Sequence, residues 1–360
     1  MTHFRTRLYV PAAVVAAIAV ASFFAYHRLS QPVAADEHPL VSTFSIVGYD
    51  PETGDLGVAV QSKFPNLRPI VPWAKAGVGA VATQSFIELD YGIKGLELME
   101  QGATAEEALE IVLRGDEGRE QRQVGMVDAN GNAATWTGSE CFDWAGGLVG
   151  QEGASAAAAA PGVVVTGNGY TAQGNILVGE ETVAAMADAY ERADGELADR
   201  LMAALIAGGK AGGDQRGEQS AALLVVRAGA GYDGADNFID ISVYDHETPI
   251  AELNRLYKLN NLYFTKSKPE NMIPVDAAIA KEIQTIWKKR GFYDGPIDGI
   301  VDAEFQQILV DYMGWENYDV RIPNVQDVDL AAGEKLMIDK EVLADIRKVF
   351  TEGRWKPRVR

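Results

Sequence analysis

The body of the chain opens on two short apolar runs separated by a polar turn. Residues 43–49 and 56–62 are rich in β-branched and apolar side chains, and the DPETGD segment between them contains the Pro and Gly typical of a turn. A third run follows at 78–83, where Gly77 and Gly79 indicate a bend or a close backbone approach. The pattern predicts strands that are buried on both faces.

Helical periodicity alternates with these strands. Residues 90–101 predict one helix, and Thr104 with Glu107 forms the capping box that starts a second helix. Residues 123–128 and 133–137 predict a hairpin across an Asn-Gly turn, whereas the alanine-rich segment 151–169 predicts an inserted surface loop. Further helices are expected at 180–193 and 196–207, and further strands at 221–226 and 239–244.

Pairs of strands that alternate with pairs of helices predict an α+β fold. Strands this apolar need cover on both faces, and two stacked sheets between helical layers provide it. We therefore expect a four-layer αββα sandwich of two antiparallel sheets over residues 43–262.

A second, small helical domain is expected after a polar linker at 263–275. Ile279, Ile283 and Trp287 follow helical spacing up to Gly291, and Asp302 can cap another helix after a Gly-rich aromatic loop. This domain is expected over 276–360, and its last part, 319–360, has no assigned role.

The first 35 residues have the pattern of a secretory leader. Arg5 and Arg7 precede an apolar run at 8–26, and a small-x-small cleavage site ends at Ala35. An uncleaved membrane anchor through 8–26 is the alternative interpretation. Both predict an exported protein of the periplasm or cell envelope, with 36–42 as a linker or propeptide.

Composition and charge exclude several classes of function. The chain has 360 residues with 32 Lys and Arg against 51 Asp and Glu, a net charge of −19, which argues against a nucleic-acid partner. The single cysteine, Cys141, permits no intrachain disulfide and favours a structural thiol. No paired-His, Cys-cluster or Gly-rich phosphate motif occurs, so neither a metal site nor a nucleotide cofactor is expected.

The opening hairpin carries a family resemblance. The hairpin, then PWAKAGVGAVATQS, then a helix resembles the start of the Ntn-hydrolase fold. Residues 43–262 also resemble the bacterial domain-of-unknown-function 1028 family, through TFSIVGYDPETGDLGVAVQSKF, RQVGMVDANGNAATWTGSEC, YTAQGNILVG and GGDQRGEQSAALLVV. Cytoplasmic members begin Met-Thr-Phe-Ser, and their threonine matches Thr43.

Thr43 is the candidate nucleophile. A threonine at a free N-terminus attacks through its hydroxyl while its own α-amine acts as the base. Here that requires a cut between Ser42 and Thr43. Lys63 and Lys75, each near a strand end, are candidates for a nearby ammonium, and Gln61 is expected to face the site with Lys63. The alternative interpretation of both lysines is a solvated strand end.

A second polar group is expected around the candidate nucleophile. The segment GGDQRGEQS precedes a buried strand, and its Asp214 and Arg216 are candidates to orient the amine or bind a carboxylate. A structural ion pair is the alternative. Asn175 and Gln84 are candidate oxyanion donors, although Asn175 could equally cap a turn. Substrate-binding candidates in this group are Gln61, Gln84, Asn175, Arg216, Gln219 and Ser220.

Residues 276–318 resemble a peptidoglycan-binding domain often fused to this family, through EIQTIWKKRGFYDGPIDGIVDAEFQQIL. The resemblance implies a helical module that binds peptidoglycan. Phe292 and Tyr293 lie in a predicted turn and are candidates to stack on sugars, with Asp298 binding hydroxyls.

Two functions of different classes follow. The first is an exported Ntn-type amidohydrolase for a small amide or peptide, tethered to the wall by its C-terminal module. The second is a non-catalytic envelope protein on the same scaffold. A serine hydrolase that uses Ser62 or Ser220 is a weaker third, since His246, beside Asp245, is the single histidine of the folded body. Self-association into a homo-oligomer stays open.

Overall fold

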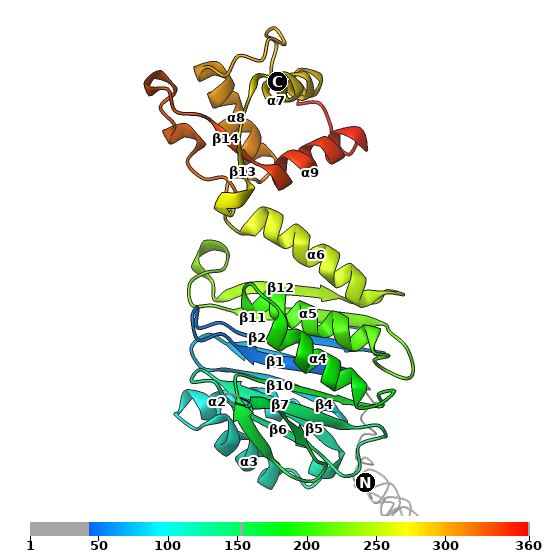
Figure 1. Cartoon of the computed structure of the whole chain (residues 1–360). Helices are drawn as coiled ribbons and strands as arrows, with labels where there is room; N and C mark the ends of the chain where they lie inside the picture. The colour runs from blue at the N-terminus through cyan, green and yellow to red at the C-terminus, as the bar shows by residue number, and fades with distance from the viewer. Residues whose placement is uncertain (1–42, 152–153, 359–360) are drawn as a thin grey trace, which may run out of the picture. The chain divides into compact units, whose positions relative to one another are not determined.

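The structure, a computed structural model, describes residues 43–151 and 154–358 (Figure 1). The predicted leader at 1–35 and the segment 36–42 lie outside the described residues. Among the residues described, no helix is both long enough and apolar enough to cross a membrane.

The larger sheet has seven strands and is antiparallel throughout. Its order is β12-β11-β2-β1-β10-β7-β8, so β1 lies at the centre between β2 and β10. The strands are β1 (Thr43–Tyr49), β2 (Leu56–Ser62), β7 (Gly146–Gln151), β8 (Ala154–Ala159), β10 (Tyr170–Asn175), β11 (Ser220–Val226) and β12 (Asn237–Val243).

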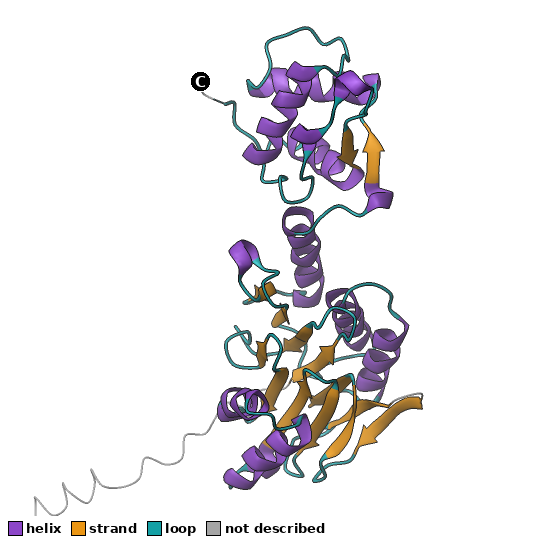
Figure 2. Cartoon of the chain, turned by 90° about the vertical axis from the view of Figure 1, so that its left-hand side faces the viewer, coloured by secondary structure: helices purple, strands orange, loops and turns teal. Residues whose placement is uncertain are grey.

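The second sheet has five antiparallel strands in the order β3-β4-β5-β6-β9. Its strands are β3 (Pro72–Lys75), β4 (Gly79–Ser85), β5 (Arg122–Asp128), β6 (Asn132–Thr137) and β9 (Val165–Asn168). Helices cover both outer faces (Figure 2). They are α2 (Asp90–Glu100) and α3 (Ala105–Gly115) on the smaller sheet, and α4 (Glu181–Arg192), α5 (Leu197–Lys210) and α6 (Pro249–Phe264) on the larger.

Three apolar clusters hold these four layers together. Alternation along β1 points Phe44 into the cluster under α4 and α5, and Val47 into the cluster between the sheets. In the second sheet Val81 faces α2 and α3, while Ala80 faces the larger sheet. The predicted α+β sandwich of two antiparallel sheets is therefore confirmed.

Two local predictions differ from the structure. The alanine-rich segment expected to be a surface loop contains β8 and β9, because its backbone pairs with the edge strands β7 and β6 of the two sheets. The run at 78–83 is preceded by the short strand β3. The capping box at Thr104 is confirmed, with its hydroxyl accepting from the backbone N–H of Glu107.

The C-terminal region forms its own apolar core of three helices and a small sheet. The expected linker at 263–275 contains the end of α6 and a strand, β13, that pairs with β14. The elements are β13 (Met272–Pro274), α7 (Ala277–Arg290), α8 (Ala303–Trp315), β14 (Met337–Asp339) and α9 (Lys340–Thr351). Single 3-10 turns occur at Arg119–Gln121, Tyr232–Gly234, Pro269–Asn271, Val325–Asp327 and Leu330–Ala332.

The two sheets come close together at Gly125. A Cβ at this position in β5 would lie 2.3 Å from Thr171 Oγ1 and 2.4 Å from Gln173 Oε1, both on β10 of the other sheet. We expect Gly125→Ala to lower the free energy of unfolding by about 1–3 kcal/mol through overpacking. Chemical denaturation checks this, with Gly115→Ala as the control, since nothing lies within 4 Å of a Cβ there. Equal stability of the two variants would contradict the prediction.

Candidate functional site

Thr43 is the first residue of the central strand, and the register decides its neighbours. It lies opposite Ser62 on β2 and Asn175 on β10, so the three side chains share the sheet face that looks toward the second sheet. All three are fully buried, and Thr43 Oγ1 donates to Ser62 Oγ at 3.2 Å. The structure thus groups a threonine, a serine and an asparagine at one end of the larger sheet.

Buried glutamines from both sheets surround this end. Gln84 Nε2, from β4, donates to Gln123 Oε1 at 2.7 Å and to the backbone oxygen of Thr43 at 3.2 Å. Gln123 also accepts from Asn175 Nδ2 at 3.0 Å, and its own Nε2 donates to the backbone oxygen of Gly174 at 2.8 Å. The wall around Thr43 is therefore built from neutral amides rather than charges.

A second arm of the same network runs along β1. Ser45 Oγ donates to Gln84 Oε1 at 2.7 Å and accepts from Gln173 Nε2 at 2.7 Å. Sequence reasoning missed Ser45 and Gln123 as members of this site. Their signal was present, because each is a polar residue that alternates with apolar ones inside a predicted buried strand.

Two left-handed residues flank the site. Ser85, directly after Gln84, has φ 72°, and Ile176, directly after Asn175, has φ 52°. A β-branched side chain is rare in this region of backbone space, and such strain gathers at functional sites. The backbone is therefore held in costly conformations on both sides of the Thr43 end.

The loop before β11 reaches the same end of the sheet. Asp214 is buried, and its carboxylate accepts from the backbone N–H of Lys63 at 3.1 Å and of Arg216 at 2.8 Å. Arg216 Nη2 also lies 3.3 Å from this carboxylate. Asp214 thus ties its loop to the end of β2, one residue after Ser62, which lies opposite Thr43.

The Lys63 side chain lies in solvent. Its Nζ donates to the backbone oxygen of Glu218 at 3.1 Å in an exposed contact. The Lys63 ammonium therefore contacts the Glu218 backbone in solvent, while the Lys63 backbone N–H donates to Asp214.

Lys75 and Gln61 do not face Thr43. Lys75 pairs with Gly79 at the far end of β4, six residues from Ser85, which is about 20 Å along a strand. Its Nζ contacts Glu100 Oε1 at 2.5 Å. Gln61 lies opposite Phe44 and therefore points to the helical face of the sheet. The expectation that Gln61 faces the site with Lys63 is wrong, because the register aligns Thr43 with Ser62 instead.

The remaining candidates from this loop take structural contacts. Ser220 lies opposite Ser62, and its hydroxyl donates to the backbone oxygen of Phe64. Gln219 Nε2 donates to Asp245 at 3.1 Å. His246 Nδ1 accepts from the backbone N–H of Thr248 at 3.0 Å, just before α6. The His246 Nδ1 atom is therefore engaged within its own loop.

Cys141 lies near the same strand ends. Its thiol contacts the backbone oxygen of Arg122 at 3.4 Å. Burial raises the pKa of the Cys141 thiol, and a hydrogen bond with Ser85 opposes that shift in part. A raised pKa leaves little thiolate at neutral pH, which agrees with a structural thiol.

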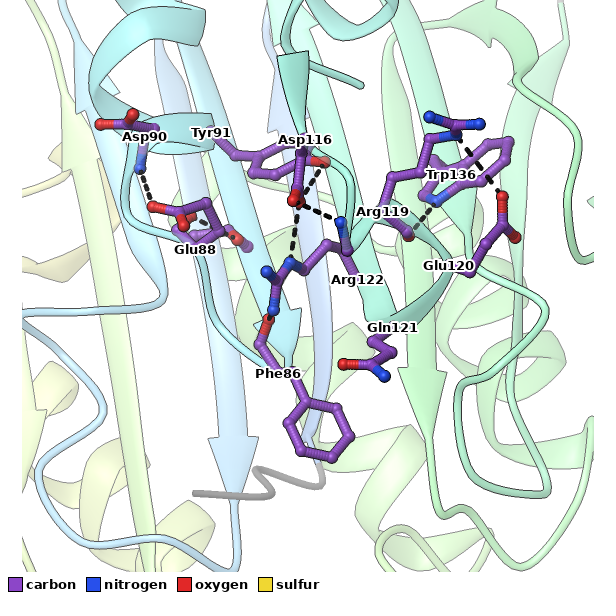
Figure 3. A network of polar contacts seen from close by, with 12 residues as sticks. Phe86, Glu88, Asp90, Tyr91, Asp116, Arg119, Glu120, Gln121, Arg122 and Trp136 are labelled. Carbon is purple, nitrogen blue, oxygen red and sulfur yellow. Dashed lines mark hydrogen bonds and ion pairs between the residues drawn. The ribbon is translucent and has the colours of Figure 1, made fainter. Parts of the chain in front are cut away.

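An ion pair fixes the chain after β4 (Figure 3). Arg122 lies opposite Ser85, and its Nη1 donates to the backbone oxygen of Phe86 at 2.8 Å. Its Nε donates to Asp116 Oδ2 at 2.8 Å, and the Tyr91 hydroxyl donates to the same oxygen at 3.0 Å. Burial opposes ionisation of Asp116, but the hydrogen bonds from Arg122 and Gly118 outweigh it and lower its pKa.

The aromatic pair predicted to stack on sugars belongs to the core of the C-terminal domain. Phe292 and Tyr293 are 6% and 7% exposed, and Phe292 contacts the Tyr312 ring edge-on at 5.1 Å between centroids. Asp298 Oδ1 accepts from Gln284 Nε2 at 2.9 Å and so closes the loop. The expectation that these two rings lie outside the core is wrong, because the tight loop folds back over α7 and α8.

Within the described ranges, no group of three or more His, Cys, Asp or Glu residues is placed to hold a metal ion.

These features define an α+β sandwich protein that carries a separate small helical domain. Residues 43–165 and 153–253 match the family of unknown function DUF1028, and the chain belongs to that family. Residues 263–344 match the family described as "Putative peptidoglycan binding domain". Together they indicate a cell-wall-associated protein of the envelope whose partner is peptidoglycan.

A solved structure supports the assignment. A crystal structure of a DUF1028 protein from Silicibacter pomeroyi is similar with a TM-score of 0.52 and 31% identity. The alignment covers 61% of this chain and 86% of that chain. No curated protein matches the sequence.

The Asp116 ion pair predicts a pH dependence of stability. Because its folded pKa lies below the ordinary 3.8, the stabilisation is present above that pH and is lost as the pH falls through the folded pKa. We expect Asp116→Asn to be less stable than wild type at pH 5–7, with the difference shrinking below about pH 3.8. Urea unfolding across this range measures the difference, and exposed Glu117→Gln is the control. A difference that stays constant down to pH 2 would rule this explanation out.

Proposed function

We propose that this protein is an exported Ntn-type amidohydrolase of a small amide or peptide, held at the cell wall by its C-terminal domain. The observation that carries the proposal is the position of Thr43. It is the first residue of the central strand, and the match to the DUF1028 family begins at the same residue. A cut before Thr43 would create a free α-amine on the same residue as the hydroxyl.

The reaction follows from that pairing. The Thr43 α-amine takes the hydroxyl proton as Oγ1 forms a bond to the substrate carbonyl carbon. The C–N bond then breaks, and the α-amine passes the proton to the leaving nitrogen. Water, deprotonated by the same amine, hydrolyses the resulting ester and restores Thr43. Each step needs only the N-terminal residue and a stabilised oxyanion.

The surroundings of Thr43 suit this chemistry. Burial disfavours an ammonium, so an α-amine released here would have a lowered pKa and act as a better base. Asn175, directly across from Thr43 on β10, would donate to the oxyanion. Lys63 would add positive charge at the rim, weakened by solvent. The glutamine network would keep these groups fixed.

One observation favours a non-catalytic protein as the second candidate. The Thr43 side chain is fully buried and its hydroxyl is hydrogen-bonded to Ser62. If residues 36–42 remain attached, the α-amine is an ordinary amide and cannot serve as a base. The protein would then bind the wall without catalysis, because the Thr43 nitrogen would stay in a peptide bond.

The N-terminus of the mature protein separates the two candidates. We expect intact mass and N-terminal sequencing of protein from its native envelope to show a chain that begins at Thr43. A chain that begins at Asp36, or retains the leader, would exclude the Thr43 mechanism and favour the binding protein.

Substitution of Thr43 tests the chemistry directly. We expect Thr43→Ala to abolish amide hydrolysis, and Thr43→Ser to retain a measurable part because a hydroxyl remains beside the α-amine. The assay is release of amine from a panel of small amides and peptides. Ser62→Ala is the matched control, since it removes the hydrogen-bond partner and keeps the nucleophile. Activity that survives in Thr43→Ala but not in Ser62→Ala, with fluorophosphonate labelling, would identify a serine hydrolase instead.

A further inference from the structure

The last described residues of the chain fold back onto the C-terminal domain. The backbone N–H of Arg358 donates to the backbone oxygen of Arg290, the last residue of α7, at 2.8 Å. Trp355 Nε1 donates to the backbone oxygen of Phe350 at 3.2 Å. This tail lies beyond residue 344, where the match to the peptidoglycan-binding family ends. The contacts that it makes are therefore additions to the shared domain.

The tail and the end of α8 place aromatic rings at the surface. Trp315 is 54% exposed and meets Phe292 edge-on, with 5.7 Å between ring centroids and 80° between planes. The rings of Phe350 and Trp355 stack at 5.6 Å and 15°. Phe292 is buried and supports the exposed ring from below. The contact with Phe292 thus holds the exposed Trp315 ring in one orientation.

Cations alternate with these rings. The Arg358 guanidinium carbon lies 5.4 Å from the Trp315 ring centroid and 5.2 Å from that of Phe292. Lys289 Nζ lies 5.3 Å from the Phe350 ring. These distances are within the range of cation–π attraction, which orients the charged groups beside the rings.

The local charge contrasts with the acidic chain as a whole. The whole protein carries −19, yet this surface gathers cations from the end of α7 and from the tail. Arg290 pairs with Glu316 at 2.6 Å, and Arg354 pairs with Glu352 at 2.6 Å. Within residues 43–151 and 154–358, Arg358 makes no ion pair. Arg290 itself is buried. The exposed cations at the end of α7 and in the tail are Lys288, Lys289, Arg354, Lys356 and Arg358.

We propose that Trp315 and Arg358 form the surface that binds peptidoglycan, with Lys289 and Trp355 at its border. The exposed indole offers a face for the C–H groups of a sugar ring, and the guanidinium offers a charge-assisted hydrogen bond to a peptidoglycan carboxylate. The inference rests on the proposed attachment to the wall and names the site that performs it. Trp315 and Arg358 take the place of Phe292 and Tyr293 as the proposed binding residues, because the rings of Phe292 and Tyr293 are buried in the core.

Sedimentation of the full chain with purified sacculi tests this surface. We expect Trp315→Ala and Arg358→Glu each to weaken binding about tenfold or more, as for central interface residues. Ile300→Ala and Lys281→Ala are matched controls. Ile300 follows Gly299, which lies beside Ala277 at the start of α7, about 20 Å from its last residue, and Lys281 lies nine residues before that last residue, about 14 Å away. We expect both controls to bind like wild type. Trp315→Phe, which keeps a ring, should retain most of the binding.

The outcomes separate the surface from the general function. If wild type does not sediment with sacculi, attachment to the wall itself is wrong. If wild type sediments and both surface variants bind equally well, attachment stands and this surface is wrong. Thermal unfolding of each variant identifies a loss of fold, in which case Arg358→Gln decides, because it removes the charge and is expected to weaken binding.

Chemical modification of the ligand tests the role of charge. Amidation of sacculus carboxylates should reduce wild-type binding to the level of the neutral variant Arg358→Gln and leave that variant unchanged. Higher salt should weaken wild type more than Arg358→Glu, because exposed charges are screened. Undiminished binding of wild type to amidated sacculi would overturn the carboxylate contact.

Discussion

The register of the central strand β1 against its two neighbours is the constraint on which the site depends. Side chains alternate along a strand, so a slip of one residue would exchange Thr43 for Phe44 on the face between the sheets. The apolar clusters on the two faces differ, and they fix the register because either slip would bury polar groups among aliphatic ones. The position of Thr43 beside Ser62 and Asn175 therefore follows from packing along the whole strand.

The glutamine network is the second consequence of that register. Buried amides are costly without hydrogen-bond partners, and partners from both sheets satisfy Gln84 and Gln123 here. Such a network fixes the spacing of the sheets at one end, while the glycine at position 125 allows a close approach further along. A reactive N-terminal residue placed here would meet a rigid, neutral surrounding.

The C-terminal domain separates structural aromatics from exposed ones. Phe292 and Tyr293 fill the core beside Trp287, while Trp315 at the end of α8 keeps half of its surface in solvent. The tail then adds cations beside the exposed ring. A wall ligand that combines sugars with carboxylates would fit this surface better than it would fit the acidic surface of the rest of the protein.

The sequence by itself determined the strands of the opening hairpin, the capping box at Thr104, the sandwich class and the candidate threonine. These follow from local rules, since alternation, turn residues and caps act within a few positions of the chain. It did not determine that Lys75 and Gln61 point away from Thr43, that Gln123 joins it, or that Phe292 is buried. Those facts depend on strand order, register and loop packing between residues far apart in sequence, and only the tertiary structure decided them.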